Sequence, residues 1–183
     1  MNLPNSLTIM RIILIPIFVV VILVRIPYGD YIAALIFSVA ALTDSLDGYL
    51  ARKRREVTTL GTILDPLADK LLVTAALICL VELARIPGWT VIVILGREFA
   101  VTGLRAIKAE QGIVIPASWM GKVKTISQIV AILLVILDTS FQQLFAFPIG
   151  LWMLYLAVLI TVVSGIDYFY RLKISEPSDG NFG

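Results

Sequence analysis

Four aspartates are the residues of this sequence best suited to carry chemistry. Asp44, Asp47, Asp65 and Asp69 lie in the segment TDSLDGYLARKRREVTTLGTILDPLADK, which strongly apolar runs flank on both sides. Each carboxylate would cost about 2.5–3.5 kcal/mol at mid-depth in a bilayer, so four together require a compensating charge. Ligands with only oxygen donors favour a hard divalent cation, Mg²⁺ first and Mn²⁺ or Ca²⁺ next.

The first two aspartates predict one polar stripe on a helix. With 3.6 residues per turn, Asp44, Asp47, Gly48 and Ala51 share one side of the helix, and Arg52 lies at its margin. The small residues leave room for a nucleotide against the helix backbone, and the Arg52 guanidinium suits a phosphate oxygen. Small residues in membrane helices also form packing seams, but their alternation with aspartates favours a ligand site here.

The next helix carries a second stripe, because Gly61, Asp65 and Asp69 recur every four residues. If the two helices are antiparallel neighbours, the four carboxylates meet near one end, where they would repel one another. Two bound Mg²⁺ ions, bridged by carboxylates, would remove that repulsion and create a site for phosphate. The spacing therefore predicts a two-metal site for phosphoryl chemistry.

These residues resemble the signature of the CDP-alcohol phosphotransferases, membrane enzymes that build phospholipids from CDP-activated alcohols. The resemblance implies a core of six transmembrane helices covering essentially the whole chain. It also implies that three aspartates are shared metal ligands, and that Asp69 is a second-metal ligand and the base. The matching positions, in order, are Asp44-x2-Asp47-Gly48-x2-Ala51-Arg52-x8-Gly61-x3-Asp65-x3-Asp69.

The same resemblance implies residues that contact the nucleotide. Gly48, Arg52 and Thr58 would contact the CDP moiety, and Asn5 and Thr8 of the opening segment would lie near the nucleotide. Judged without the family, Asn5 and Thr8 are ordinary capping residues at a helix start. Both roles are compatible.

Within the family, the segments NLPNSLTIMR, GREFAVTGLR and MGKVKT resemble the branch that joins CDP-diacylglycerol to glycerol 3-phosphate and releases CMP. A phosphate-bearing acceptor needs a cationic pocket, for which Arg97, Arg105, Lys122 and Lys124 are the candidates. Arg97 begins inside an apolar stretch, and we do not expect it to pair with Glu98, because adjacent helical residues do not face each other. Glu98 shares a stripe with Arg105 and is expected to support the pocket through it.

The whole sequence predicts an all-α membrane protein with six transmembrane helices. Its 183 residues are 59% hydrophobic with a mean hydropathy of +0.96, well above the apolar share of about half in soluble domains. We expect one membrane domain over 1–173 and a short polar tail over 174–183. Apolar runs of about 20 residues, enough to cross a bilayer, occur at about 6–27, 31–53, 61–84, 88–109, 117–138 and 147–171.

The composition also excludes several kinds of site and predicts an orientation. Histidine is absent and Cys79 is the single cysteine, which excludes imidazole bases, His-ligated zinc and a disulfide. Basic residues, including the run Arg52–Arg55, gather on one side of the spans. The positive-inside rule therefore predicts that both termini and the aspartates face the cytoplasm at the cell membrane. The same run suits contacts to anionic lipid.

Two other functions stay open. Another enzyme of the family would make phosphatidylinositol phosphate, phosphatidylserine or cardiolipin, although a basic acceptor pocket argues against serine. A divalent-cation transporter would line a pathway with aspartates, but these charges crowd one edge of the spans. The expected partners are CDP-diacylglycerol, glycerol 3-phosphate, membrane lipids and a second copy in a homodimer, with two Mg²⁺ ions, or Mn²⁺, as cofactor and no nucleic acid.

Overall fold

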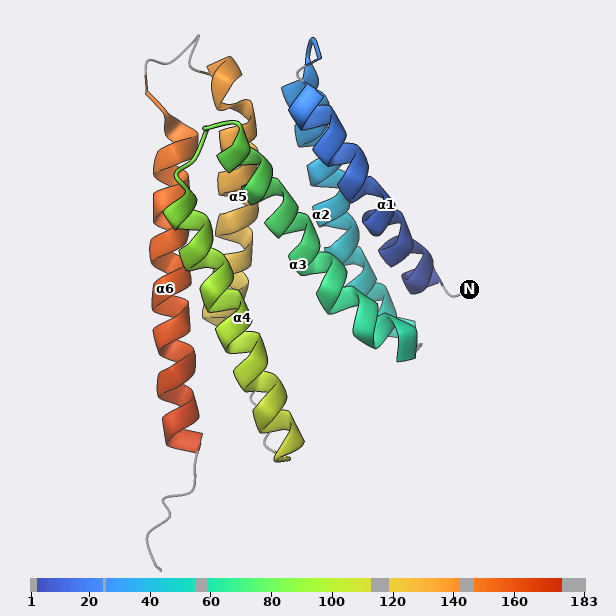
Figure 1. Cartoon of the computed structure of the whole chain (residues 1–183). Helices are drawn as coiled ribbons and strands as arrows, with labels where there is room; N and C mark the ends of the chain where they lie inside the picture. The colour runs from blue at the N-terminus through green and yellow to red at the C-terminus, as the bar shows by residue number, and fades with distance from the viewer. Residues whose placement is uncertain (1–2, 25, 55–58, 113–118, 142–146, 176–183) are drawn as a thin grey trace, which may run out of the picture.

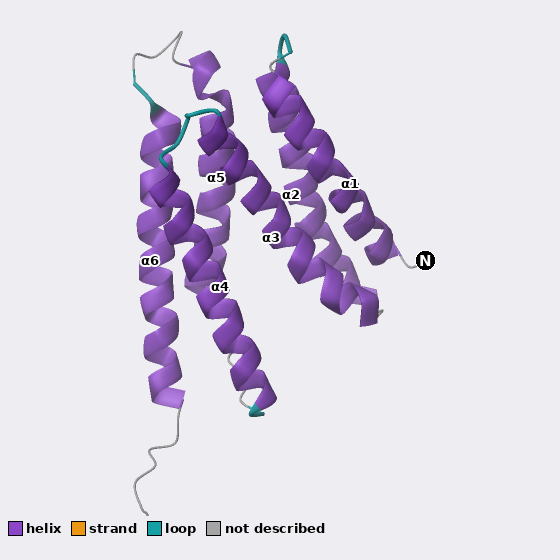
Figure 2. Ribbon diagram, viewed as in Figure 1, coloured by secondary structure: helices purple, strands orange, loops and turns teal. Residues whose placement is uncertain are grey.

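The computed structural model describes residues 3–24, 26–54, 59–112, 119–141 and 147–175. Within these ranges the side chains at 3–8, 44–54, 59–67, 69, 139–141 and 173–175 lie outside the description. The described residues are helical apart from short turns, which confirms the all-α prediction (Figure 2). They form six helices: α1 (Leu3–Val24), α2 (Gly29–Arg54), α3 (Thr59–Glu82), α4 (Gly88–Glu110), α5 (Trp119–Phe141) and α6 (Ile149–Ser175).

Consecutive helices run in opposite directions (Figure 1). The start of α1 therefore lies at the same end of the molecule as the ends of α2, α4 and α6 (Figure 1). Helix α1 packs on α2 and α3, α5 packs on α6 and α2, and α4 packs on α6. This arrangement brings the start of α1, the end of α2 and the start of α3 to one end of the bundle.

The core is formed by apolar residues at helical spacing on the inward faces. Phe18 of α1 and Phe37 of α2 are fully buried, and their ring centroids are 5.8 Å apart. Small residues allow close helix approach, most clearly at Gly150, where an added Cβ would lie 2.7 Å from the Val135 backbone. The α5–α6 pair therefore depends on a glycine at that crossing.

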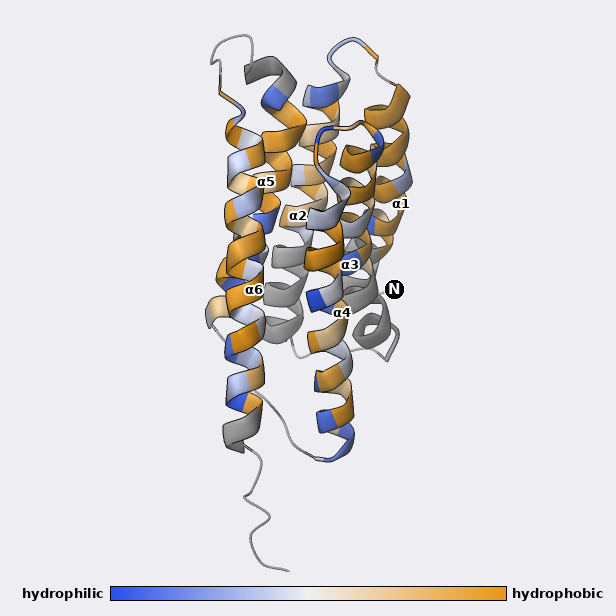
Figure 3. Cartoon of the chain, turned by 60° about the vertical axis from the view of Figure 1, so that its left-hand side comes forward, coloured by the Kyte–Doolittle hydropathy of each residue, from blue (hydrophilic) through white to orange (hydrophobic). Residues whose placement is uncertain are grey.

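Hydrophobic residues occupy much of the described part of the helices (Figure 3). Among the described residues, two segments are long and apolar enough to cross a membrane, Trp119–Asp138 and Ile149–Leu172, and Ile9–Val24 and Gly29–Thr43 are shorter apolar stretches. Hydrophilic residues concentrate toward the lower ends of α4 and α6 (Figure 3). Large exposed apolar side chains suit contact with lipid tails, and they include Val20, Leu35, Ile92, Ile126 and Leu159.

Candidate functional site

The aspartate signature occupies the end of α2 and the first half of α3. Asp44 and Asp47 lie in α2, and Asp65 and Asp69 lie in α3, which contacts α2. The side chains of these four residues lie outside the described set, as do those of Asn5, Thr8, Gly48, Ala51, Arg52 and Gly61, and Thr58 lies outside it altogether. The backbone therefore places the predicted metal and nucleotide positions on α1, α2 and α3 at one end of the bundle.

The side of α3 that carries the signature is its inner side. Ala68, Leu72 and Ala76 are buried, and the helical repeat puts positions 65 and 69 on the same side as these three residues. Four carboxylates on two contacting helices are a donor set that fits a hard divalent cation. Among the described side chains there is no group of three or more potential metal ligands.

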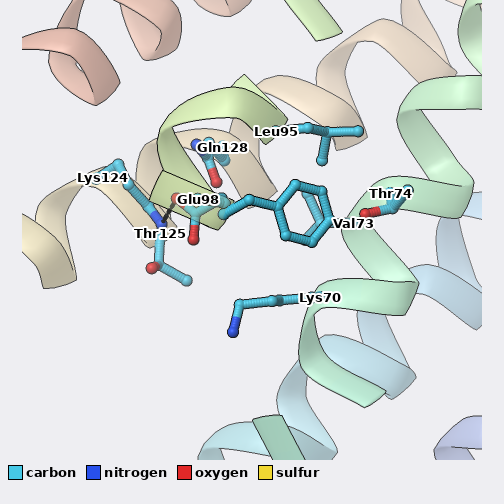
Figure 4. Close-up of a pocket in the computed structure, with 9 residues that line it drawn as sticks. Lys70, Val73, Thr74, Leu95, Glu98, Lys124, Thr125 and Gln128 are labelled. Carbon is cyan, nitrogen blue, oxygen red and sulfur yellow. Dashed lines mark hydrogen bonds and ion pairs between the residues drawn. The ribbon is translucent and has the colours of Figure 1, made fainter. Parts of the chain in front are cut away.

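A cleft opens beside the aspartate signature, between α3, α4 and α5 (Figure 4). The space within it, including the part that is open to the outside of the protein, is about 380 Å³. Lys70 contributes to the cleft from α3 and directly follows Asp69 in the chain. The lining side chains are Lys70, Val73, Thr74, Leu95, Glu98, Phe99, Lys124, Thr125 and Gln128.

Glu98 is the centre of a polar network in this cleft. Its Oε1 atom accepts a hydrogen bond from Lys124 Nζ, an ion pair drawn as a dashed line in Figure 4. The same oxygen accepts from Arg97 Nη1 at 3.2 Å. The side chains of Lys124, Arg97 and Glu98 are only 8%, 14% and 18% exposed, so these charges interact with little screening by water.

The expectation that Arg97 and Glu98 do not pair is therefore wrong. Adjacent Cβ atoms on a helix do diverge, but the Arg97 side chain is long enough for its guanidinium to reach the carboxylate. Its Nη2 atom donates to Ser164 Oγ of α6 at 2.8 Å. Arg97 is not among the residues that line the cleft, and it is linked to the cleft only indirectly, by its ion pair with Glu98.

A second series of hydrogen bonds holds Gln128, one of the residues that line the cleft. Gln128 of α5 donates from Nε2 to Thr161 Oγ1 of α6 at 2.8 Å, and Thr161 donates to the Ala157 carbonyl at 2.7 Å. Both side chains are buried. A buried amide with a fixed partner holds one orientation, so the part of Gln128 that faces the cleft is pre-positioned.

The other two basic candidates lie elsewhere. The Arg105 guanidinium stands 5.6 Å from the ring centroid of Tyr168 on α6, a cation–π distance, whereas the described contacts of Glu98 are to Arg97 and Lys124. The expected contact between Glu98 and Arg105 is therefore not seen among the described residues. Glu98 pairs with Arg97 and Lys124 instead, and Arg105 lies against Tyr168. Lys122 is exposed near the start of α5. The structure thus joins Arg97 and Lys124 into one network and leaves Arg105 and Lys122 outside it.

Sequence reasoning missed several polar residues of this region. Lys70, Gln128 and Ser164 were detectable as polar residues inside or beside apolar runs, which in membrane helices are usually functional. Arg11 is the clearest omission, because it is 1% exposed in α1. It lies one helical turn after Thr8, inside the segment NLPNSLTIMR.

The chain belongs to the CDP-alcohol phosphatidyltransferase family, whose model matches residues 1–163. This is a membrane-embedded family whose members generally use a divalent metal. The chain is 47% identical over 182 residues to the CDP-diacylglycerol–glycerol-3-phosphate 3-phosphatidyltransferase of Bacillus subtilis (strain 168), covering 93% of this chain and 94% of the relative.

Other relatives with the same description are more distant but equally complete. The protein of Rickettsia bellii (strain RML369-C) is 37% identical over 173 residues, covering 94% of this chain and 96% of the relative. The protein of Haemophilus influenzae (strain Rd) is 40% identical over 177 residues, covering 94% of each. The similarity therefore extends over the whole bundle, well beyond the aspartate signature.

Proposed function

We infer that this protein transfers the phosphatidyl group of CDP-diacylglycerol to sn-glycerol 3-phosphate, giving phosphatidylglycerophosphate and CMP. The observation that carries this conclusion is the similarity of 37–47% over more than nine-tenths of the chain to relatives described by that activity. The uninterrupted aspartate signature supports it. The protein is therefore an enzyme of phospholipid biosynthesis.

The proposed reaction is a substitution at the β-phosphorus of CDP-diacylglycerol. A hydroxyl oxygen of glycerol 3-phosphate forms the new phosphorus–oxygen bond, and the bond between that phosphorus and the bridging oxygen of the diphosphate breaks. CMP leaves with the electron pair, and the carboxylate of Asp69 takes the hydroxyl proton. The residues that would hold two Mg²⁺ ions, or Mn²⁺, are Asp44, Asp47, Asp65 and Asp69, and the bound ions would neutralise the diphosphate and the departing CMP.

We propose that the nucleotide lies against the end of α2 and the neighbouring ends of α1 and α3. Support comes from the backbone arrangement, which gathers these three helix ends at one end of the bundle (Figure 1). The small residues of the signature would let the nucleotide approach the helices closely. The proposed contacts are Asn5, Thr8, Gly48, Ala51, Arg52, Thr58 and Gly61.

The acceptor is proposed to bind in the cleft between α3, α4 and α5. Its lysines, Lys70 and Lys124, together with Arg97 behind Glu98, present three cations against one carboxylate. This excess suits a phosphate monoester, which carries close to two negative charges near neutral pH. We assign direct phosphate contact to Lys124 and an indirect role to Arg97.

Arg105 and Lys122 stay proposed acceptor contacts that the described network does not include. Arg105 lies against Tyr168 and Lys122 is exposed, so both would contribute long-range attraction more than a fixed hydrogen bond. Such attraction is screened by salt. Their substitution should therefore matter most at low ionic strength.

We propose six membrane crossings in the cell membrane with the site on the cytoplasmic side. Support comes from the alternating helix directions and from the position of Arg105, Lys108 and Lys122 at the end of the bundle that carries the aspartates. At the opposite end, Arg85 is neutralised by Asp30 in a two-oxygen ion pair at 2.8 and 3.0 Å. A homodimer is proposed on the resemblance to the family alone.

The acceptor assignment is tested by giving the purified protein CDP-diacylglycerol, Mg²⁺ and one labelled acceptor at a time. Glycerol 3-phosphate should give labelled lipid, whereas inositol phosphate, serine and phosphatidylglycerol should not. Efficient use of another acceptor would move the assignment elsewhere within the family. Uptake of divalent metal into protein-containing vesicles, with no lipid product, would favour transport instead.

A further inference from the structure

Arg97 lies across the backbone of α6 at a glycine. A Cβ atom added at Gly165 would come within 3.1 Å of Arg97 Cγ and 3.6 Å of Arg97 Nε. The first distance is below normal van der Waals contact, so a side chain at this position would displace the arginine stem. Gly165 therefore provides the space in which the stem lies.

The guanidinium is held on both sides. Nη2 donates to Ser164 Oγ at 2.8 Å, and Nη1 donates to Glu98 Oε1 at 3.2 Å. Ser164 is fully buried, so its hydroxyl is an acceptor with a fixed place. The Nε atom of Arg97 is buried and has no hydrogen-bond partner among the described residues, which leaves two residues to orient the head group.

We propose that Ser164 and Gly165 of α6 form a seat that positions Arg97, and that Arg97 in turn holds Glu98 in the orientation that places Lys124 at the acceptor cleft. This inference rests on the proposed acceptor function of that cleft. Helix α6 carries none of the eight signature residues. It therefore contributes to the reaction by positioning a cation that the motif does not supply.

The reason for a seat lies in the charges that meet at one oxygen. Glu98 Oε1 accepts from both Arg97 and Lys124, so the orientation of the carboxylate depends on both cations. Without the Arg97 side chain, Lys124 is the one remaining described partner of the Glu98 carboxylate. The Lys124 ammonium is then less firmly oriented. Ordering a long cationic side chain costs rotamer entropy. Because Ser164 and Gly165 already hold Arg97 in place, this cost does not fall on acceptor binding.

The test compares Ser164→Ala and Gly165→Ala with the matched control Gly103→Ala on α4, where an added Cβ meets nothing within 4 Å. Each seat variant should raise the KM for glycerol 3-phosphate roughly 10-fold, as expected from weakening one hydrogen bond to a charged group. The KM for CDP-diacylglycerol should stay unchanged, and the control should match the parent protein. If Gly165→Ala does not fold, Ser164→Ala still tests the seat, because it only removes a hydroxyl.

A double-mutant cycle separates positioning from general damage. In an Arg97→Ala background, Ser164→Ala and Gly165→Ala should add nothing to the KM for glycerol 3-phosphate, because the residue they position is gone. Additive effects would overturn the seat. If Arg97→Ala raises this KM but both seat variants leave it unchanged, the seat is wrong and the acceptor cleft stands. If Arg97→Ala itself leaves it unchanged, both the seat and the indirect role of Arg97 are wrong.

Discussion

Replacing Lys124 by methionine tests the acceptor cleft most directly. Lys124 lines the cleft with a side chain that is 8% exposed, and its ammonium pairs with Glu98. Methionine keeps the length and apolar stem of lysine and removes only the charge. Glu98 keeps its ion pair with Arg97 at 3.2 Å, so the variant does not leave an unpaired carboxylate, and the protein should fold.

The expected magnitude follows from the burial of the ammonium. A hydrogen bond to a charged group contributes about 1.5–3 kcal/mol, which corresponds to a rise of about 10- to 150-fold in the KM for glycerol 3-phosphate. The matched control is Lys122→Met, two residues earlier on the same helix and exposed. An exposed charge contributes about 0–1 kcal/mol, so the control should raise this KM by less than about 5-fold.

Saturation curves for both substrates, measured on the two purified variants, decide the matter. The KM for CDP-diacylglycerol should change little in either, because the nucleotide is assigned to the other side of the aspartates. Equal effects of the two substitutions would show that only general attraction is at work. An unchanged KM for glycerol 3-phosphate in Lys124→Met would place the acceptor outside this cleft.

Three other predictions concern the metal, the orientation and the packing. Chelation with EDTA should abolish turnover and added Mg²⁺ or Mn²⁺ should restore it; full activity in EDTA would refute a metal site. A cysteine at Arg54, with Cys79 replaced by alanine, should react with an impermeant thiol reagent only from the cytoplasmic side, and labelling from outside intact cells would reverse the orientation. Gly150→Ala should lower the free energy of unfolding, measured by thermal unfolding in detergent, by about 1–3 kcal/mol, because its Cβ would collide with the α5 backbone. Equal effects of Gly150→Ala and of Gly103→Ala, where the added Cβ meets nothing within 4 Å, would contradict this packing.

The helices were predictable because their signals are local. Apolar runs of membrane-spanning length place the ends of each helix within four residues of those observed. Short connectors between the first four runs also require antiparallel neighbours. The four aspartate positions gather at one end of the bundle for the same reason, because the end of α2 and the start of α3 lie there.

The partners of individual charges were not predictable, because they depend on packing between distant segments. Glu98 meets Lys124 across 26 residues, and Arg97 meets Ser164 across 67. Helical-wheel reasoning assigned Glu98 to Arg105, which shares its stripe, but the α4–α6 contact instead offers Arg105 the ring of Tyr168. Long basic side chains reach well beyond the stripe that their Cα atoms define, so the wheel predicts the face of a helix more reliably than it predicts an ion pair.

We propose that the aspartate signature catalyses the transfer of a phosphatidyl group and that Asp69 is the base. The most direct test of this proposal measures CMP release and labelled lipid together, for the parent protein and for Asp69→Asn, with CDP-diacylglycerol, labelled glycerol 3-phosphate and Mg²⁺. The parent should form the two products in equal amounts, and the variant should bind CDP-diacylglycerol but form neither, because an amide cannot take the hydroxyl proton. Near-normal turnover by Asp69→Asn would show that Asp69 is not the base, and CMP release without lipid product in the parent would contradict phosphatidyl transfer.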